Sequence, residues 1–235
     1  MINQIKKEFL KYSNPSKARH SSRFFKTGKG EYGEGDIFLG ITMPQIRGVV
    51  KRYYKDTPLK DLLYFIQSKY HDYRMFGLLC LVYKYEKAKT EEERKEIYDI
   101  YMSNTKYINN WDLVDITAPK IVGEYLKDKE RNILYTFAKS KDLWKQRISI
   151  ISTFTFIRNN YFKDTLSISE ILVNHEHDLI HKAVGWMLRE VGKKDIDVEE
   201  KFLKKYYKTM PRTMLRYAIE KFPEEKRQKY LKGEI

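Results

Sequence analysis

The sequence predicts an all-α protein, a solenoid built from successive helix pairs. Its 235 residues contain only six prolines and eleven glycines, so few positions interrupt a helix. Apolar residues recur at the spacing of one helix face, as in Ile46, Val49, Val50 and Tyr53. Basic residues recur at intervals of about 35 positions, a period typical of stacked helix pairs. We expect residues 1–235 to form a single domain.

Helix starts are legible at several places along the chain. Each combines a capping residue or a proline with a following apolar run. The short helices and short connections that result suit antiparallel helix pairs. The starts are Thr57-Pro58, Thr90 with Glu93, Asp142 and Met210-Pro211.

The repeat shows most clearly in the second helix of each expected pair. Arg147, Lys182 and Arg216 follow one another at about 35 residues, and Arg74 lies roughly two such intervals upstream of Arg147. A solenoid of this kind is curved and has one concave face. Basic residues at one repeat position predict a ridge that contacts phosphates. Solvated charges on unrelated helices would give the same spacing, and that alternative stays open.

One segment, residues 24–40, breaks the helical pattern. It contains four glycines within eight residues, flanked by aromatic and branched side chains. This composition predicts a small β-hairpin insertion or a mobile loop. The segment matches G-x-G-x-x-G at Gly28, Gly30 and Gly33, but a phosphate loop needs a strand before it and a helix at its last glycine. Because an apolar stretch follows instead, we expect no cofactor there.

The charge balance predicts a polyanionic partner. Lys and Arg number 46 against 32 Asp and Glu, which gives a net charge of +14. Nucleic acid and an anionic membrane surface both fit this charge, and a merely soluble basic protein is the alternative. No stretch approaches the roughly 20 apolar residues that span a bilayer. The lone Cys80 has no internal disulfide partner, so we expect a cytoplasmic protein.

Candidate chemistry lies where Trp111 and Asp115 are four residues apart. On a helix the two side chains share one face, which places an aromatic plane beside a carboxylate and suits a cationic guest. A core tryptophan and a solvated aspartate would give the same pattern. Trp144 and Trp186 each lie near a basic residue, a pairing that fits contacts to sugar and phosphate.

Four motifs, separated along the chain, together resemble a known family. They are Phe38-Leu39-Gly40-Ile41, Trp111-Asp112-Leu113-Val114-Asp115, Trp144-Lys145-Gln146-Arg147 and Ala183-Val184-Gly185-Trp186-Met187-Leu188-Arg189-Glu190. In this order they resemble the HEAT-like repeat DNA alkylation-repair proteins of the AlkD type. The resemblance implies a C-shaped solenoid of about six HEAT-like helix pairs. It also implies relatives that excise cationic N3- and N7-alkylated purines without flipping the base.

The functional residues of that family map onto positions present in this chain. The active-site aspartate falls on Asp115 and the groove arginine on Arg147. The two tryptophans fall on Trp111 and Trp186. The resemblance implies that Asp115 supplies negative charge and orients a water, that the tryptophans shelter the cationic deoxyribose, and that Arg147 binds a phosphate. It implies a monomer that needs no metal and no organic cofactor.

Two stretches depart from the glycosylase pattern. Arg23-Phe24 stands where the glycosylases have Arg-Tyr, and residues 40–44 read Gly-Ile-Thr-Met-Pro where they have Gly-Ile-Gln-Thr-Pro. The glycine-rich insertion is similar to the hairpin of a side branch that favours branched DNA. In that interpretation Lys26, Lys29 and Tyr32 contact DNA. A surface loop without function is the alternative.

We therefore expect a nucleoid-associated DNA-repair protein that holds branched or damaged DNA in a basic concave groove. Arg74, Lys182 and Arg216 join Arg147 as expected DNA contacts. A monofunctional DNA glycosylase is the main alternative, since the residues carried over from the family are all present. A helical-repeat scaffold for an acidic protein is the remote one.

Overall fold

The computed structural model describes residues 1–235, and most of them lie in helices joined by short connections. No β-sheet is present, and the one isolated bridge joins Ile37 and Tyr70. The prediction of an all-α fold is therefore confirmed. The chain divides into two compact units, residues 1–121 and 122–235, and each is described by itself.

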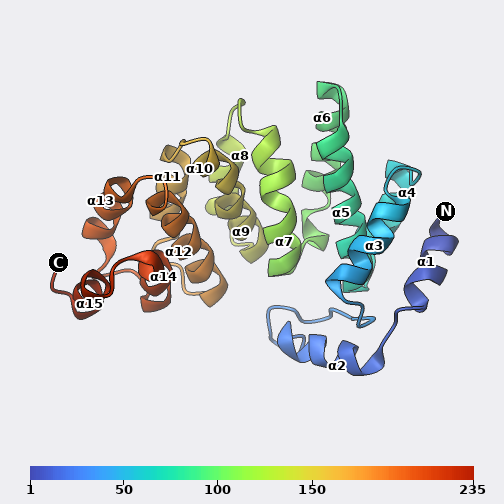
Figure 1. The fold of residues 1–235 in the computed structure, drawn as a ribbon, viewed down its shortest axis with the longest axis horizontal. Helices are drawn as coiled ribbons and strands as arrows, with labels where there is room; N and C mark the ends of the chain where they lie inside the picture. Colours follow the sequence, from blue (N-terminus) through green and yellow to red (C-terminus); the bar gives the residue numbers. More distant parts are fainter. The chain divides into compact units, whose positions relative to one another are not determined.

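The first unit is arranged around one long helix, α5. Its helices are α1 (Ile2–Leu10), α2 (Pro15–Phe24), α3 (Met43–Tyr53), α4 (Leu59–Ile66), α5 (His71–Lys87), α6 (Glu91–Ser103), η1 (Thr105–Tyr107) and α7 (Trp111–Ala118). Helix α5 packs against α3, α4, α6 and α7, which lie around it in Figure 1. Every α5 residue from His71 to Val82 is buried, because neighbours cover this part of the helix on all sides.

The second unit contains two helix pairs, α8 with α9 and α11 with α12, and α13 and α14 each pack against α12. Its elements are α8 (Asn132–Ala138), α9 (Leu143–Ser152), α10 (Phe154–Arg158), α11 (Lys163–Leu172), α12 (Asp178–Gly192), α13 (Ile196–Tyr206), α14 (Arg212–Ala218), η3 (Ile219–Lys221) and α15 (Glu224–Lys232). A π-helical turn, η2 (Pro119–Gly123), includes the boundary between the units. Helix α12 contacts both α9 and α14, so consecutive pairs pack on one another. Arg147, Lys182 and Arg216 lie on α9, α12 and α14, respectively.

The expected helix starts are formed by local side-chain hydrogen bonds. The Thr90 hydroxyl accepts a bond from the Glu93 amide, and the Glu93 carboxylate accepts one from the Thr90 amide, which completes a capping box. The Asp142 carboxylate accepts bonds from two amides in the first turn of α9. Helices α4 and α14 each begin directly after a proline. These starts are therefore encoded locally.

The β-hairpin expected near residues 24–40 is wrong, because the segment forms successive turns and no strand pairing. The Glu31 carboxylate accepts a bond from the Gly28 amide, and the Glu34 carboxylate accepts one from the Gly30 amide, each 2.8 Å long. Gly30 adopts a left-handed conformation with φ of 78°. The carboxylates thus occupy amides that a β-ladder would need, and the backbone curls instead of extending.

Two smaller expectations concern Cys80 and membranes. Cys80 is fully buried in α5, as its apolar neighbours predict, and burial raises the pKa of its thiol. No helix is both long enough and apolar enough to cross a membrane.

Glu199 is a buried carboxyl group that has no hydrogen-bond partner for one of its oxygens. The residue lies on α13 and is 1% exposed, and its Oε1 atom is unpaired. Burial and the neighbouring Glu200 charge raise the pKa of Glu199 to about 9, while Arg189 acts in the opposite direction. The carboxyl group is therefore protonated at neutral pH.

We expect Glu199→Gln to stabilise the protein at alkaline pH. In the unfolded chain Glu199 ionises near its ordinary value of 4.5, whereas the folded protein keeps the proton until about pH 9. Wild-type stability therefore falls as pH rises through this window, and the variant is spared that loss, which is on the order of 4 kcal/mol between pH 5 and pH 8. Urea unfolding at pH 5 and pH 8 measures the effect. A benefit of equal size at both values would contradict the assignment.

Candidate functional site

Trp111 and Asp115 lie one turn apart on α7, as their spacing predicts, and both are half-buried. The helix begins at Trp111 because the Asn110 side chain accepts a hydrogen bond of 2.9 Å from the Trp111 amide. The Asn110 side-chain nitrogen also donates to an Asp36 oxygen at 3.1 Å. The start of α7 is thus anchored to the glycine-rich segment.

A stack of aromatic rings packs against one face of Trp111. The Trp111 ring stacks on Phe25 with centroids 5.3 Å apart and an interplanar angle of 23°. Phe25 stacks in turn on Phe38 at 5.1 Å, and Phe38 stacks on the His71 imidazole at 4.6 Å. The stack links α7 to the first residue of α5 through rings that pack face to face.

The stack ends on a buried cluster of four ionisable side chains, here called the His71 cluster. His71 lies between two carboxylates, with Nδ1 3.0 Å from Asp36 and Nε2 2.9 Å from Asp112. The Arg74 guanidinium donates to the other Asp36 oxygen at 2.5 Å. Two cations and two anions balance the charge, which is what a buried ionic group requires.

The cluster holds His71 in its protonated form. Burial by itself lowers the pKa of His71, but the Asp112 charge and the hydrogen bonds to Asp112 and Asp36 outweigh it and raise the pKa to about 9. For the Asp36 carboxyl, burial acts in the opposite direction and raises the pKa. The hydrogen bond from His71 and the charge of Arg74 outweigh burial and bring the pKa of Asp36 below its usual value. His71 therefore donates from both ring nitrogens at neutral pH.

The first turn of α5 also binds the last residues of the glycine-rich segment. The His71 amide donates to the Ile37 carbonyl at 2.8 Å. The Asp72 carboxylate accepts bonds from the Leu39 and Ile41 amides at 2.7 and 3.0 Å. Together with the Asp36 contacts, these bonds fix residues 36–41 against the end of α5. This docking explains why residues 36–41 lie against α5, whereas residues 28–31 stay exposed.

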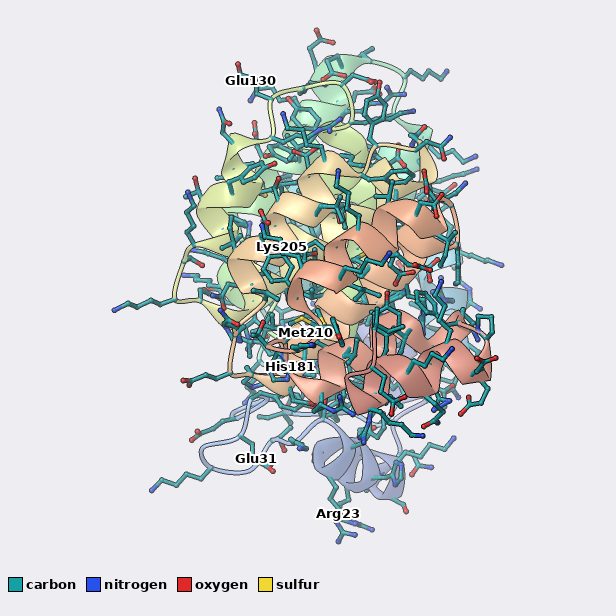
Figure 2. All side chains as sticks on the ribbon, turned by 90° about the vertical axis from the view of Figure 1, so that its left-hand side faces the viewer. Arg23, Glu31, Glu130, His181, Lys205 and Met210 are labelled. Atoms are coloured by element: carbon teal, nitrogen blue, oxygen red, sulfur yellow. The ribbon has the colours of Figure 1, made fainter.

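One exposed ring, Phe24, contacts Trp111 at the surface, and exposed cations lie in the same chain segment. Phe24 is 58% exposed and meets the Trp111 ring edge to face at 6.0 Å. Arg23 extends from α2 into solvent in Figure 2. The Lys26 amine lies 6.0 Å from the Tyr32 ring centroid, and Lys29 is exposed. The expected DNA contacts Lys26, Lys29 and Tyr32 therefore lie in one surface segment, residues 23–32. This segment contacts Trp111 through Phe24 and Phe25.

The expected basic contacts differ in exposure. Arg74 is 3% exposed and serves the His71 cluster, and Arg147 is 4% exposed and donates to the Leu179 carbonyl, which ties α9 to α12. Lys182 is half-buried and pairs with Asp178 at 2.6 Å. Arg216 is exposed on α14. The shared repeat position thus does not give these residues a common environment.

Trp186 lies in the second unit, on α12. It is half-buried, its ring is 5.9 Å from the Phe154 ring, and its indole N–H donates to Glu190 at 3.1 Å. Trp111 and Asp115 are thus brought together within the first unit, while Arg147 and Trp186 belong to the second.

Sequence reasoning missed the His71 cluster. Asp36, His71 and Asp112 lie far apart along the chain, and no spacing rule connects them. One signal was present: Leu78-Leu79-Cys80-Leu81-Val82 is apolar without a break, which predicts a helix buried on every side. Polar residues at the start of such a helix must be paired. The apolar run thus points to paired polar side chains at His71 and Arg74.

We expect His71 to titrate near pH 9. The NMR signal of its ring Cε1–H group, identified by its loss in His71→Gln, reports the protonation directly. Because the folded pKa is raised, the stabilisation is complete below pH 6.5 and is lost as pH rises through 9. His71→Gln should lower the free energy of unfolding at pH 7 by about 3 kcal/mol, since it removes the buried cation that pairs with both Asp36 and Asp112.

The matched control is His20→Gln, which alters an exposed ring on α2. This change should leave the free energy of unfolding unaltered. A His71 signal that titrates at or below pH 6.5 would show that the imidazole is not held between Asp36 and Asp112.

Comparison with known proteins agrees with this fold and these motifs. The family of DNA alkylation repair enzymes matches residues 5–222. A predicted DNA alkylation repair enzyme from Enterococcus faecalis is similar in structure, with a TM-score of 0.72, 18% identity and coverage of 89% of this chain and 96% of that one. AlkD2 from Streptococcus mutans gives a TM-score of 0.55 and 19% identity over 88% of this chain and 97% of that one. No curated protein matches the sequence significantly.

These structural neighbours share less than a quarter of their residues with the chain, so they establish the fold alone. The family match is a separate observation, because it extends over nearly the whole sequence and includes each motif described above. This protein belongs to the DNA alkylation repair enzyme family.

Proposed function

We propose that this chain is a DNA-binding repair protein that holds damaged or branched DNA against the face of α7 formed by Trp111 and Asp115. The observation that carries the proposal is the fixed geometry of that face. The aromatic stack and the His71 cluster support the start of α7, so an aromatic ring and a carboxylate are held side by side. Rigid support of this kind is what a contact surface needs.

Charge supports DNA as the partner. The chain carries a net charge of +14, and its family acts on alkylated DNA. Arg23 and Lys29, exposed cations of the segment whose Phe24 and Phe25 contact Trp111, suit phosphates. Phe24, exposed at the edge of Trp111, suits contact with a base or sugar where the duplex is disrupted. The feature that favours distorted DNA is therefore the exposed Phe24 ring at the edge of Trp111, and the β-hairpin expected from the sequence has no part in it.

We expect the affinity for a short duplex to fall steeply with salt. Each phosphate neutralised by a cation releases counterions, so four such contacts reduce the affinity about a hundredfold between 50 and 200 mM salt. Fluorescence anisotropy with a labelled duplex measures this dependence. An affinity that barely changes with salt would favour the protein-scaffold alternative.

A second candidate function, DNA glycosylase, is favoured by the placement of Asp115 one turn from Trp111. A cationic alkylated purine is a good leaving group. When its bond to C1′ breaks, the electron pair leaves with the base, and the sugar becomes an oxocarbenium ion. The Trp111 face and the Asp115 charge would stabilise that cation. A water oxygen then bonds to C1′, and its proton passes to Asp115.

If the chain is a glycosylase, Asp115→Asn should reduce the release of methylated purines at least about a hundredfold, because a neutral amide neither stabilises the oxocarbenium ion nor accepts the proton. Its affinity for DNA should stay within about twofold, since the change removes no cation. Single-turnover release from alkylated duplex measures the rate. Asp56→Asn, at an exposed carboxylate of the same unit, is the matched control.

The outcomes separate the two candidates. Release by the wild type and by Asp56→Asn, but not by Asp115→Asn, supports the glycosylase. DNA binding by all three proteins with release by none supports a repair protein that binds only. Equal release by all three would remove Asp115 from the mechanism.

A further inference from the structure

A hollow outside the Trp111 face lies between α1, α4 and the connection that leads into α5. Its volume is about 520 Å³, within the range of roughly 300 to 1,000 Å³ typical of small-ligand sites. The surrounding chain segments belong to the first unit. None of the functional residues expected from the sequence lines it, so the hollow is separate from the site described above.

The lining of this hollow is cationic and lacks acidic residues. Lys6 and Lys69 contribute ammonium groups, and no Asp or Glu lines the hollow. The Lys6 amine donates to the Tyr64 hydroxyl at 3.1 Å, and the Lys69 amine lies 5.4 Å from the Tyr70 ring centroid. Neither lysine forms an ion pair with a carboxylate. Two uncompensated cations across a hollow suit an anionic group such as a phosphate.

Tyrosine side chains supply the remaining surface. Tyr64 is 46% exposed, and Tyr70 and Tyr73 pack edge to face at 5.6 Å. Burial, with the nearby Tyr64 and Tyr70 hydroxyls, raises the pKa of Tyr73 to about 12, so its phenol keeps its proton and remains a donor. Exposed rings provide faces for stacking, and phenol groups provide hydrogen bonds to a base or a sugar.

We propose that this hollow binds one unstacked nucleotide of a single-stranded DNA arm, with its phosphate between Lys6 and Lys69 and its base against Tyr64 or Tyr70. The inference rests on the proposed DNA-binding function and names the part of a branched substrate that this unit recognises. Lysines with tyrosines, and no carboxylates, match the combination of charged and stacking groups that grips single strands.

The same chain connection serves both the hollow and the Trp111 site. Tyr70 forms the bridge to Ile37 and directly precedes His71. Arg74, a member of the His71 cluster, donates to the Ser68 carbonyl at 3.1 Å. The backbone of residues 68–70 is therefore fixed by the groups that support Trp111. An arm held in the hollow would place the adjoining duplex close to this unit's contact face.

The test compares a forked duplex that carries a short oligothymidine arm with a blunt duplex of the same sequence. We expect the wild type to bind the fork about tenfold more tightly. Lys6→Gln/Lys69→Gln and, separately, Tyr64→Ala should remove most of this preference while they change affinity for the blunt duplex about twofold or less. Lys87→Gln/Lys89→Gln removes the same charge from exposed positions elsewhere in the unit and should keep the preference.

Competition with thymidine 5′-monophosphate shows whether the hollow binds a free nucleotide or only a nucleotide within a strand. If millimolar nucleotide removes the fork preference, the hollow takes the free nucleotide as well as the arm; if only the oligonucleotide competes, the hollow requires a strand. A fork preference that persists in both hollow variants overturns the inference. If the wild type binds no DNA, the proposed function fails, and NMR titrations with thymidine monophosphate and with oligothymidine then test the hollow alone. Lys69 and Tyr70 signals that neither titrant changes overturn the inference.

Discussion

The first unit depends on the pairing of protonated, buried His71 with the buried Asp36 and the half-buried Asp112. Asp36 comes from the glycine-rich segment, His71 from the start of α5 and Asp112 from the first turn of α7. Removing His71 leaves Asp112 without its cation and Asp36 with Arg74 alone, and such a loss in the interior costs more than the value of an exposed ion pair. The cluster therefore acts as a joint between segments that are distant in sequence.

The His71 cluster determines how the Trp111 ring is oriented at the surface of the first unit. Phe38 and Phe25 continue from the imidazole to the Trp111 ring, so the orientation of this tryptophan follows from contacts below it. Phe24 then meets Trp111 from the solvent side. A side chain that is stacked on one face loses little conformational freedom when it binds a partner. The arrangement suits a surface that receives a ligand without rearranging.

In the second unit a residue of the family motif also has a structural contact. Arg147 is buried and donates to a backbone carbonyl of α12. Its presence in the motif is therefore consistent with tying neighbouring helix pairs as well as with contacting DNA. Buried arginines of this kind must satisfy their donors within the protein, because an unpaired guanidinium in the interior is costly. Arg216, by contrast, is exposed and available to a partner.

The sequence by itself determined the local features: helix periodicity, capping boxes, the helix-pair period and the common face of Trp111 and Asp115. These depend on residues within a few turns of one another, and such interactions are readable from spacing. Tertiary structure alone decided that the glycine-rich segment folds back and that Arg74 is buried. Both follow from the His71 cluster, in which His71 meets Asp36 and Asp112, 35 and 41 residues away. Local spacing carries no record of such pairings, because burial of a charge depends on which distant partner reaches it.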